Sequence, residues 1–220
     1  MPRPSRNIDE LLLQTGRDLL AESGARALSI RKLTQRAGVN LGMFHYHFKT
    51  RENFIRTLLQ QIYDEMFASL SVQVERQRNS YETLRAAVRV LARFGRDHRR
   101  LLLRICLDAL NGERVAAQFL QSNLPRHVQV IVGLITAGQA EGVLRKVPVM
   151  QAAAFVAGSV GAPILIGTAA MASGLMPAAV SAQLEAEILS DEAIEQRIDM
   201  ALSGLSLRAG VSSERERHAS

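Results

Sequence analysis

Apolar residues recur every three or four positions along most of this chain, and that spacing is typical of the buried face of an α-helix. It predicts helices over residues 7–23, 30–37, 41–48, 50–78, 81–97, 99–110, 112–122, 125–138 and 148–173, with a last helix that begins near residue 191. On that last helix the apolar side chains are spaced four, four and three apart and form one stripe. We therefore expect an all-α protein.

Residues 28–52 carry the signals of two short helices joined by a tight turn. Ser29 can cap the first helix by accepting a hydrogen bond from a backbone N–H of its first turn, and Asn40 can cap the second in the same way. Between them, Gly38 breaks the first helix and can adopt the positive φ that a sharp turn requires. Such a pair forms a helix-turn-helix, whose second helix normally enters the major groove of DNA.

The same residues resemble those of a known family. They read Ala-Gly-Val-Asn at 37–40, Gly-Met-Phe-His-Tyr-His-Phe at 42–48 and Lys-Thr-Arg-Glu at 49–52, which is similar to the tetracycline-repressor (TetR) family of bacterial transcription regulators. The resemblance extends over about residues 7–60. It implies a ligand-responsive DNA-binding regulator, most often a homodimeric repressor that leaves its double-stranded operator DNA when a small effector binds.

The resemblance also implies which side chains face DNA. The family pattern places on that side Ser29, Arg31, Asn40, Leu41, Gly42, Met43, His45, Tyr46, Lys49 and Arg51, and Gln35 and Arg36 join them at the exposed end of the first motif helix. Met43 stands where the family has a small hydroxyl residue, and it cannot donate a hydrogen bond. His45 stands where the family usually has a tyrosine. Phe44 and Phe48 are instead expected to pack into the domain core.

Two domains follow from the resemblance. A three-helix DNA-binding domain is expected over residues 1–52, a larger helical ligand-binding and dimerisation core over 53–210, and a disordered tail over 211–220. Inward-facing candidates for binding an apolar effector are Phe94, His98, Cys106, Phe119, His127 and Phe155. The homodimer interface is expected on the charge-free helix 148–173 and on the stripe of the last helix, at Phe155, Gly158, Ile194, Ile198, Leu202 and Leu205.

Positive charge is concentrated at the N-terminal end of the chain. The formal net charge is +6, and residues 1–51 hold nine Lys or Arg against four Asp or Glu, whereas the remainder is almost balanced. Neutralisation of DNA phosphates requires such an excess on the helix-turn-helix. A separate row of basic residues consists of Arg85, Arg89, Arg93, Arg96, Arg100 and Arg104. This row is either a solvated face or a site for an anionic head group, such as that of an acyl thioester.

The sequence lacks the motifs of several enzyme and metal-binding classes. It has no glycine-rich phosphate loop, nucleophile elbow or Cys-x-x-Cys pair, and His45 and His47 lie about 200° apart around a helix, too far to share a metal. We therefore expect no enzyme activity, cofactor or metal, with an enzyme carrying a DNA-binding domain as one alternative. The charge-free residues 147–184 leave a membrane-associated helical protein as another. A single cysteine and a polar N-terminus favour the cytoplasm.

Overall fold

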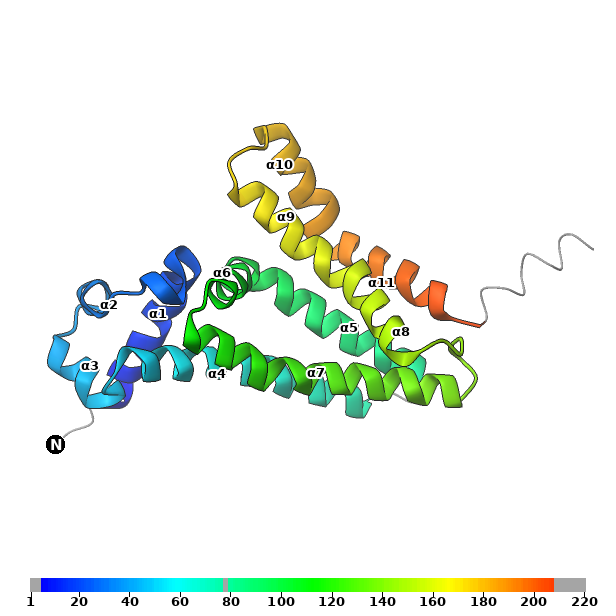
Figure 1. Cartoon of the computed structure of the whole chain (residues 1–220), viewed down its shortest axis with the longest axis horizontal. Helices are drawn as coiled ribbons and strands as arrows, with labels where there is room; N and C mark the ends of the chain where they lie inside the picture. Colours follow the sequence, from blue (N-terminus) through cyan, green and yellow to red (C-terminus); the bar gives the residue numbers. More distant parts are fainter. Residues whose placement is uncertain (1–4, 77–78, 208–220) are drawn as a thin grey trace, which may run out of the picture. The chain divides into compact units, whose positions relative to one another are not determined.

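The computed structural model describes residues 5–76 and 79–207, and within these residues every regular element is helical. The prediction of an all-α protein is thereby confirmed. In chain order the elements are α1 (Ser5–Ala27), α2 (Ile30–Ala37), α3 (Leu41–Phe48), α4 (Arg51–Arg76), α5 (Ser80–Asp97), α6 (Arg99–Leu110), α7 (Arg114–Ala140), α8 (Val149–Val156), the π-helical segment η1 (Ala157–Gly161), α9 (Ala162–Ala172), α10 (Ala178–Leu184), the π-helical segment η2 (Glu185–Leu189) and α11 (Asp191–Leu205) (Figure 1).

The chain divides into two compact units. The first comprises Met1–Glu65 and Arg100–Leu124, and the second comprises Met66–Arg99 and Pro125–Ser220. The first unit extends beyond the domain expected over residues 1–52, because the start of α4 packs its side chains onto α1 and α3. The tail expected over residues 211–220 lies outside the described residues.

Three phenylalanines form the aromatic centre of the first unit. The ring centroid of Phe54 on α4 lies 5.4 Å from that of Phe44 and 4.9 Å from that of Phe48, both on α3. Phe48, the most exposed of the three, is only 5% exposed. Gly16 allows α1 to approach this cluster, because a Cβ atom there would lie 2.5 Å from Phe54 Cζ. The expected anchoring of Phe44 and Phe48 is confirmed.

The apolar stripe of α11 lies in the core of the second unit. Ile194, Ile198 and Leu202 are fully buried and Leu205 is 8% exposed, on a helix that packs against α5, α8, η1 and η2. Side chains that are buried within their own chain have no surface left for a second copy. The expectation that these four residues form the dimer interface is therefore corrected. Their periodicity identified a buried face, but not the surface against which it is buried.

Apolar side chains do lie on the outside of α8, η1 and α9. Met150 is 64% exposed, Phe155 46% and Ile166 67%, and Gly158 is also exposed. The continuous stretch Val149–Ala172 is long and apolar enough to cross a membrane by length and composition alone, and only 28% of its apolar part is buried. The second unit therefore has an apolar face that its own described residues do not cover.

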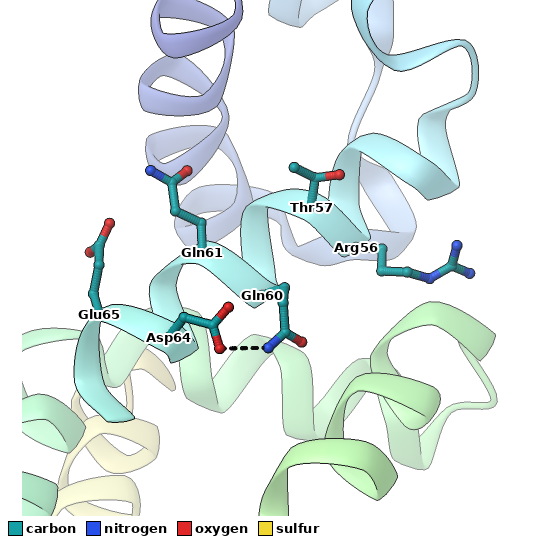
Figure 2. Close-up of a pocket in the computed structure, with 6 residues that line it drawn as sticks. All are labelled: Arg56, Thr57, Gln60, Gln61, Asp64 and Glu65. Atoms are coloured by element: carbon teal, nitrogen blue, oxygen red, sulfur yellow. Dashed lines mark hydrogen bonds between the residues drawn. The ribbon is translucent and has the colours of Figure 1, made fainter. Parts of the chain in front are cut away.

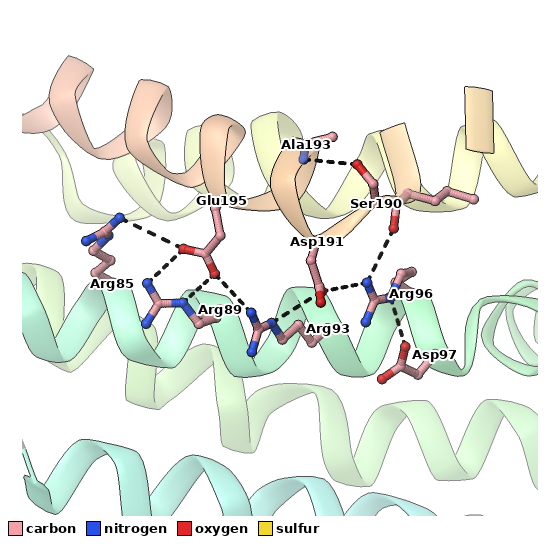
Figure 3. A network of polar contacts seen from close by, with 10 residues as sticks. Arg85, Arg89, Arg93, Arg96, Asp97, Ser190, Asp191, Ala193 and Glu195 are labelled. Atoms are coloured by element: carbon pink, nitrogen blue, oxygen red, sulfur yellow. Dashed lines mark hydrogen bonds and ion pairs between the residues drawn. The ribbon is translucent and has the colours of Figure 1, made fainter. Parts of the chain in front are cut away.

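The arginine row of α5 faces α11, where carboxylates neutralise it (Figure 3). Arg89 binds Glu195 with two nitrogens, Nε at 2.5 Å and Nη2 at 2.7 Å. The remaining pairs are Arg85 with Asp199 at 2.6 Å, Arg96 with Asp191 at 2.6 Å and Arg93 with Glu195 at 3.5 Å. Outside the row, Arg99 of α6 pairs with Glu185 of η2 at 2.8 Å. Both interpretations offered for Arg85 to Arg96 are corrected: these side chains join two helices. Arg100 and Arg104 belong to the first unit and are exposed.

α7 is one helix where two were predicted. It runs from Arg114 to Ala140 with Pro125 inside it, whereas the sequence favoured a break before this proline. A proline inside a helix removes a backbone donor and normally destabilises the helix. Just before it, two tertiary hydrogen bonds join α7 to α4: Tyr63 Oη donates to the Asn123 carbonyl at 2.9 Å, and Asn123 Nδ2 donates to Gln60 Oε1 at 3.2 Å. Partners this distant in sequence cannot be inferred from local pattern.

Candidate nucleic-acid interface

The two motif helices begin and end where the sequence predicts. Ser29 caps α2 by accepting from the Lys32 N–H at 3.4 Å, and Asn40 caps α3 by accepting from the Met43 N–H at 2.9 Å. Gly38 ends α2 in the left-handed region, with φ 67° and ψ 26°. No atom lies within 4 Å of the position that a Cβ would occupy there, so the backbone conformation, not lack of space, requires glycine. The helix-turn-helix is confirmed.

α3 has one anchored face and one free face. While Phe44 and Phe48 hold it to the core, Leu41 is 50% exposed and Tyr46 is 73% exposed. Gly42 and Lys49 are exposed as well. A rigid helix that presents a leucine and a tyrosine outward can place apolar and hydroxyl groups against base edges in a major groove.

The C-terminal end of α3 positions two basic side chains. Lys49 ends the helix with φ 64° and ψ −56°, a positive φ that is uncommon outside glycine. His45 Nδ1 lies 3.0 Å from the Lys49 carbonyl oxygen. Since a carbonyl only accepts, Nδ1 carries the proton of this hydrogen bond, and Nε2 can donate to a phosphate oxygen only when the imidazole is charged.

Basic side chains also line α2, where Arg31, Lys32 and Arg36 are exposed together with Gln35. Arg36 Nη1 lies 2.7 Å from Glu22 Oε1, and Lys32 Nζ lies 3.9 Å from Glu22 Oε2. The hydrogen bond to Arg36 lowers the pKa of Glu22 and raises the pKa of Arg36. Exposed ion pairs are weak, so Arg36 can exchange this carboxylate for a phosphate. Sequence reasoning overlooked Lys32, although its basic neighbours were a signal.

Arg51 turns toward the end of α1. Its Nε donates to the Leu28 carbonyl at 2.8 Å, and its Nη2 donates to the carbonyls of Ala25 and, at 3.0 Å, Arg26. Carbonyl groups at a helix end lack partners within the helix, and this guanidinium supplies them. The family resemblance places Arg51 on the DNA-facing side, whereas in the free protein its donors bind backbone carbonyls at the end of α1 and just after it.

Asp108 of α6 also binds this segment, the joint between α1 and α2, but through backbone N–H groups. Its Oδ2 accepts from the Ala25 N–H at 2.6 Å and from the Arg26 N–H at 3.3 Å. The preceding Gly24 has φ 79°, and a Cβ on it would lie 2.6 Å from Asp108 Oδ2. Asp108 was missed in the sequence, because nothing around it indicates a partner 83 positions away. The joint between α1 and α2 is thus fixed by two charged side chains.

An open hollow lies on α4 in the first unit (Figure 2). All its lining residues come from α4, namely Arg56, Thr57, Gln60, Gln61, Asp64 and Glu65. Gln60 Nε2 donates to Asp64 Oδ1 across it at 2.8 Å. None of the predicted effector-binding residues lines it.

The six predicted effector residues fall in both units. Cys106 and Phe119 belong to the first unit, whereas Phe94, His98, His127 and Phe155 belong to the second. In the second unit, the rings of Phe94 and His98 lie 4.5 Å apart. Burial raises the pKa of the Cys106 thiol and lowers the pKa of the His127 imidazole. Their role in ligand binding remains a prediction.

Comparison with known proteins supports the same interpretation of the motif. Residues 12–58 match the family model for bacterial regulatory proteins of the tetR family. The chain is 31% identical over 77 residues to the HTH-type transcriptional repressor KstR2 of Rhodococcus jostii strain RHA1, an alignment that covers 35% of this chain and 38% of that repressor. The chain thus spans less than half the length of this curated relative in the alignment.

Solved structures resemble almost the whole chain. The ketosteroid regulator KstR2 of Mycobacterium tuberculosis aligns with a TM-score of 0.69 at 18% identity, over 93% of this chain and 97% of that one. FadR of Bacillus subtilis, solved in complex with stearoyl-CoA, aligns with a TM-score of 0.61 at 16% identity, over 83% of this chain and 98% of that one. At these identities the likeness shows the fold.

Proposed function

We propose that this chain, which belongs to the TetR family of bacterial regulatory proteins, is a homodimeric repressor that releases its operator DNA when a small apolar effector binds. One observation carries the DNA-binding part: α3 is held to the core by Phe44 and Phe48 while Leu41 and Tyr46 remain on its free face. Excess positive charge on residues 1–51 supports the same role.

Contacts to DNA divide into two classes in this proposal. Ser29, Arg31, Arg36 and Lys49 hold phosphates and set the position of the protein, because hydroxyl, guanidinium and ammonium groups bind phosphate oxygens irrespective of sequence. Leu41 and Tyr46 meet base edges. The remaining members of the predicted surface, Gln35, Asn40, Gly42, Met43 and His45, lie around these contacts on α2 and α3.

Arg51 is omitted from the phosphate class, which gives a matched pair of variants. Lys49→Met should weaken binding to operator and random DNA alike, with a salt slope reduced by about one unit. Arg51→Met should instead lower the stability of the free protein, because it leaves carbonyls of Leu28 and Ala25 without their donor. Equal effects of both variants on the salt slope would return Arg51 to the phosphate class.

The second copy of the chain is proposed to cover the apolar face of α8, η1 and α9. Phe155 and Gly158 remain from the sequence prediction, and Met150 and Ile166 join them because they are exposed. The face is free of charge, as are obligate interfaces at their centre. A two-fold arrangement would present two copies of α3 to successive major grooves about 34 Å apart.

An apolar effector is proposed because the helices of the second unit are lined mainly by aliphatic side chains. Val156, Val160 and Ile164, for example, are all buried. FadR of B. subtilis, which shares the fold, was solved with stearoyl-CoA. A thermal-shift screen of fatty acids, acyl thioesters and aromatic compounds, followed by operator release, tests the proposal. Hits restricted to sugars, nucleotides or metal ions would refute the apolar effector and leave the DNA-binding role intact.

A further inference from the structure

Arg197 on α11 differs from the arginines of α5. Its Nε, Nη1 and Nη2 atoms are all buried, and none of them has a hydrogen-bond partner. Arg85, Arg89 and Arg96, in contrast, each bind a carboxylate of the same unit. A buried guanidinium without an acceptor is costly, because it has lost its hydration and gained nothing in return. Burial accordingly lowers the pKa of Arg197.

No carboxylate of α11 binds this guanidinium. Positions three and four residues away on the same face hold Ala193, Ile194, Met200 and Ala201. The acidic residues Asp191, Glu195 and Asp199 are spaced four apart on another side of the helix, where they bind the arginines of α5. Figure 3 shows Asp191 and Glu195 in these contacts. The acidic side chains Asp191, Glu195 and Asp199 of α11 therefore bind α5, and Arg197 has no carboxylate partner on its own helix.

The side of α11 that carries Arg197 faces α8 and η1, which together form a wall without charged residues. Gly204 lies seven residues further on the same side of the helix, and a Cβ on it would be 3.7 Å from the ring of Phe155 on α8. α11 also packs against η1, which continues α8. Because residues 147–184 contain no Asp or Glu, this wall offers Arg197 no carboxylate. A second copy docked on the same wall would offer none from these residues either.

None of the described residues supplies the missing acceptor, and we propose that it is the carboxylate of an amphipathic effector, a monocarboxylate with an apolar tail. This inference rests on the proposed function of the chain as a ligand-responsive regulator. A planar guanidinium matches a carboxylate with two parallel hydrogen bonds, and one cation balances one monoanion. The apolar groups proposed to receive the tail are the buried side chains of Val156, Val160, Ile164 and Leu189 in the same unit.

Binding at this site also supplies a conformational preference. The nitrogens of Arg197 are covered in the present conformation, so the carboxylate reaches them only after the wall or the side chain shifts. The wall includes the π-helical turn η1 with Gly158 and Gly161, and π-helical turns occur frequently at functional sites. A ligand that binds only the shifted conformation changes the population of states, as release of an operator requires.

The test uses decanoate and its neutral analogue decanol as probes on the full chain. Titration calorimetry of the wild type and of Arg197→Met gives the affinities, with Arg93→Met as a control that removes an exposed, paired arginine from α5. Decanoate affinity should fall about tenfold or more in Arg197→Met and remain unchanged in Arg93→Met. Decanol affinity should be the same in all three proteins.

A second readout needs no ligand. Ligand-free Arg197→Met should unfold at a higher temperature than the wild type, because an unpaired buried charge is replaced by an apolar side chain of similar length. Arg197→Lys, which keeps a charge but loses the bidentate geometry, should bind decanoate less tightly than the wild type. Equal decanoate affinity in wild type and Arg197→Met, or no decanoate binding by the wild type, would overturn the inference. Operator binding, measured in parallel, distinguishes that result from failure of the proposed function.

Discussion

The joint between α1 and α2 offers the most quantitative prediction about this fold. Asp108 Oδ2 accepts from the Ala25 N–H at 2.6 Å, and Ala25 is fully buried. Asp108→Ala leaves that N–H without a partner and without water, which costs about 1–3 kcal/mol. The second contact, to the Arg26 N–H at 3.3 Å, adds little because Arg26 is exposed and water can replace the carboxylate. Asp108→Asn keeps an acceptor and should lose less than Asp108→Ala.

A double-mutant cycle with Gly24 sharpens this prediction. Gly24→Ala places a Cβ 2.6 Å from Asp108 Oδ2 and forces an alanine to φ 79°, so the single variant carries both a steric and a conformational penalty. In the Asp108→Ala background the steric penalty disappears, while the conformational penalty remains. The double variant should therefore be more stable than the sum of the single losses implies, by about 0.5–3 kcal/mol.

Urea unfolding followed by circular dichroism measures the four proteins of this cycle. The slope of free energy against urea concentration must be similar in all four for the comparison to hold. Strictly additive losses would show that Asp108 and Gly24 do not contact each other. Loss of less than about 0.5 kcal/mol in Asp108→Ala would show that the hydrogen bond to Ala25 does not stabilise the joint.

Three further predictions concern the DNA surface, the dimer and the response to acid. Lys49→Met should reduce the salt slope of DNA binding by about one unit, measured by fluorescence anisotropy at several salt concentrations, and an unchanged slope would remove Lys49 from the phosphate contacts. Ile166→Glu should yield monomers in sedimentation velocity, since it puts a charge on the apolar face, whereas the same change at Leu110, which is 84% exposed in the first unit, should leave the dimer intact. The hydrogen bond from Arg89 lowers the pKa of Glu195 from its usual value of 4.5. The stability that this ion pair gives the folded protein is therefore present above pH 4.5 and is lost as the pH falls through the lower pKa of the folded state. Acid unfolding of Glu195→Gln should accordingly show a weaker pH dependence below about pH 4.5.

Short-range features of this protein could be predicted from the sequence. The caps at Ser29 and Asn40, the turn at Gly38 and the buried pair Phe44 and Phe48 all depend on residues within a few positions of one another. Propensity and periodicity contain this information directly. The boundaries of α2 and α3 therefore agree with the prediction.

Long-range partners could not be predicted in the same way. Periodicity showed that Ile194 and Ile198 face an apolar environment, but core and dimer interface give the same pattern. The family resemblance placed Arg51 on the DNA-facing side, while its acceptors in the free protein are carbonyls 23 to 26 positions earlier in the chain. Likewise, the arginines of α5 find carboxylates about 100 positions away on α11. Pairs of this kind arise only when the chain is folded.

Selection of bound duplexes from a random DNA pool tests the central claim most directly. The account predicts enrichment of a two-fold symmetric site whose half-sites are about one helical turn apart, bound by the wild type with far higher affinity than random DNA. Tyr46→Ala, which changes a side chain that is 73% exposed and should leave stability intact, is predicted to reduce the ratio of specific to random binding by about tenfold. If the wild type enriches no sequence over the starting pool, it does not read DNA through α3 as proposed here.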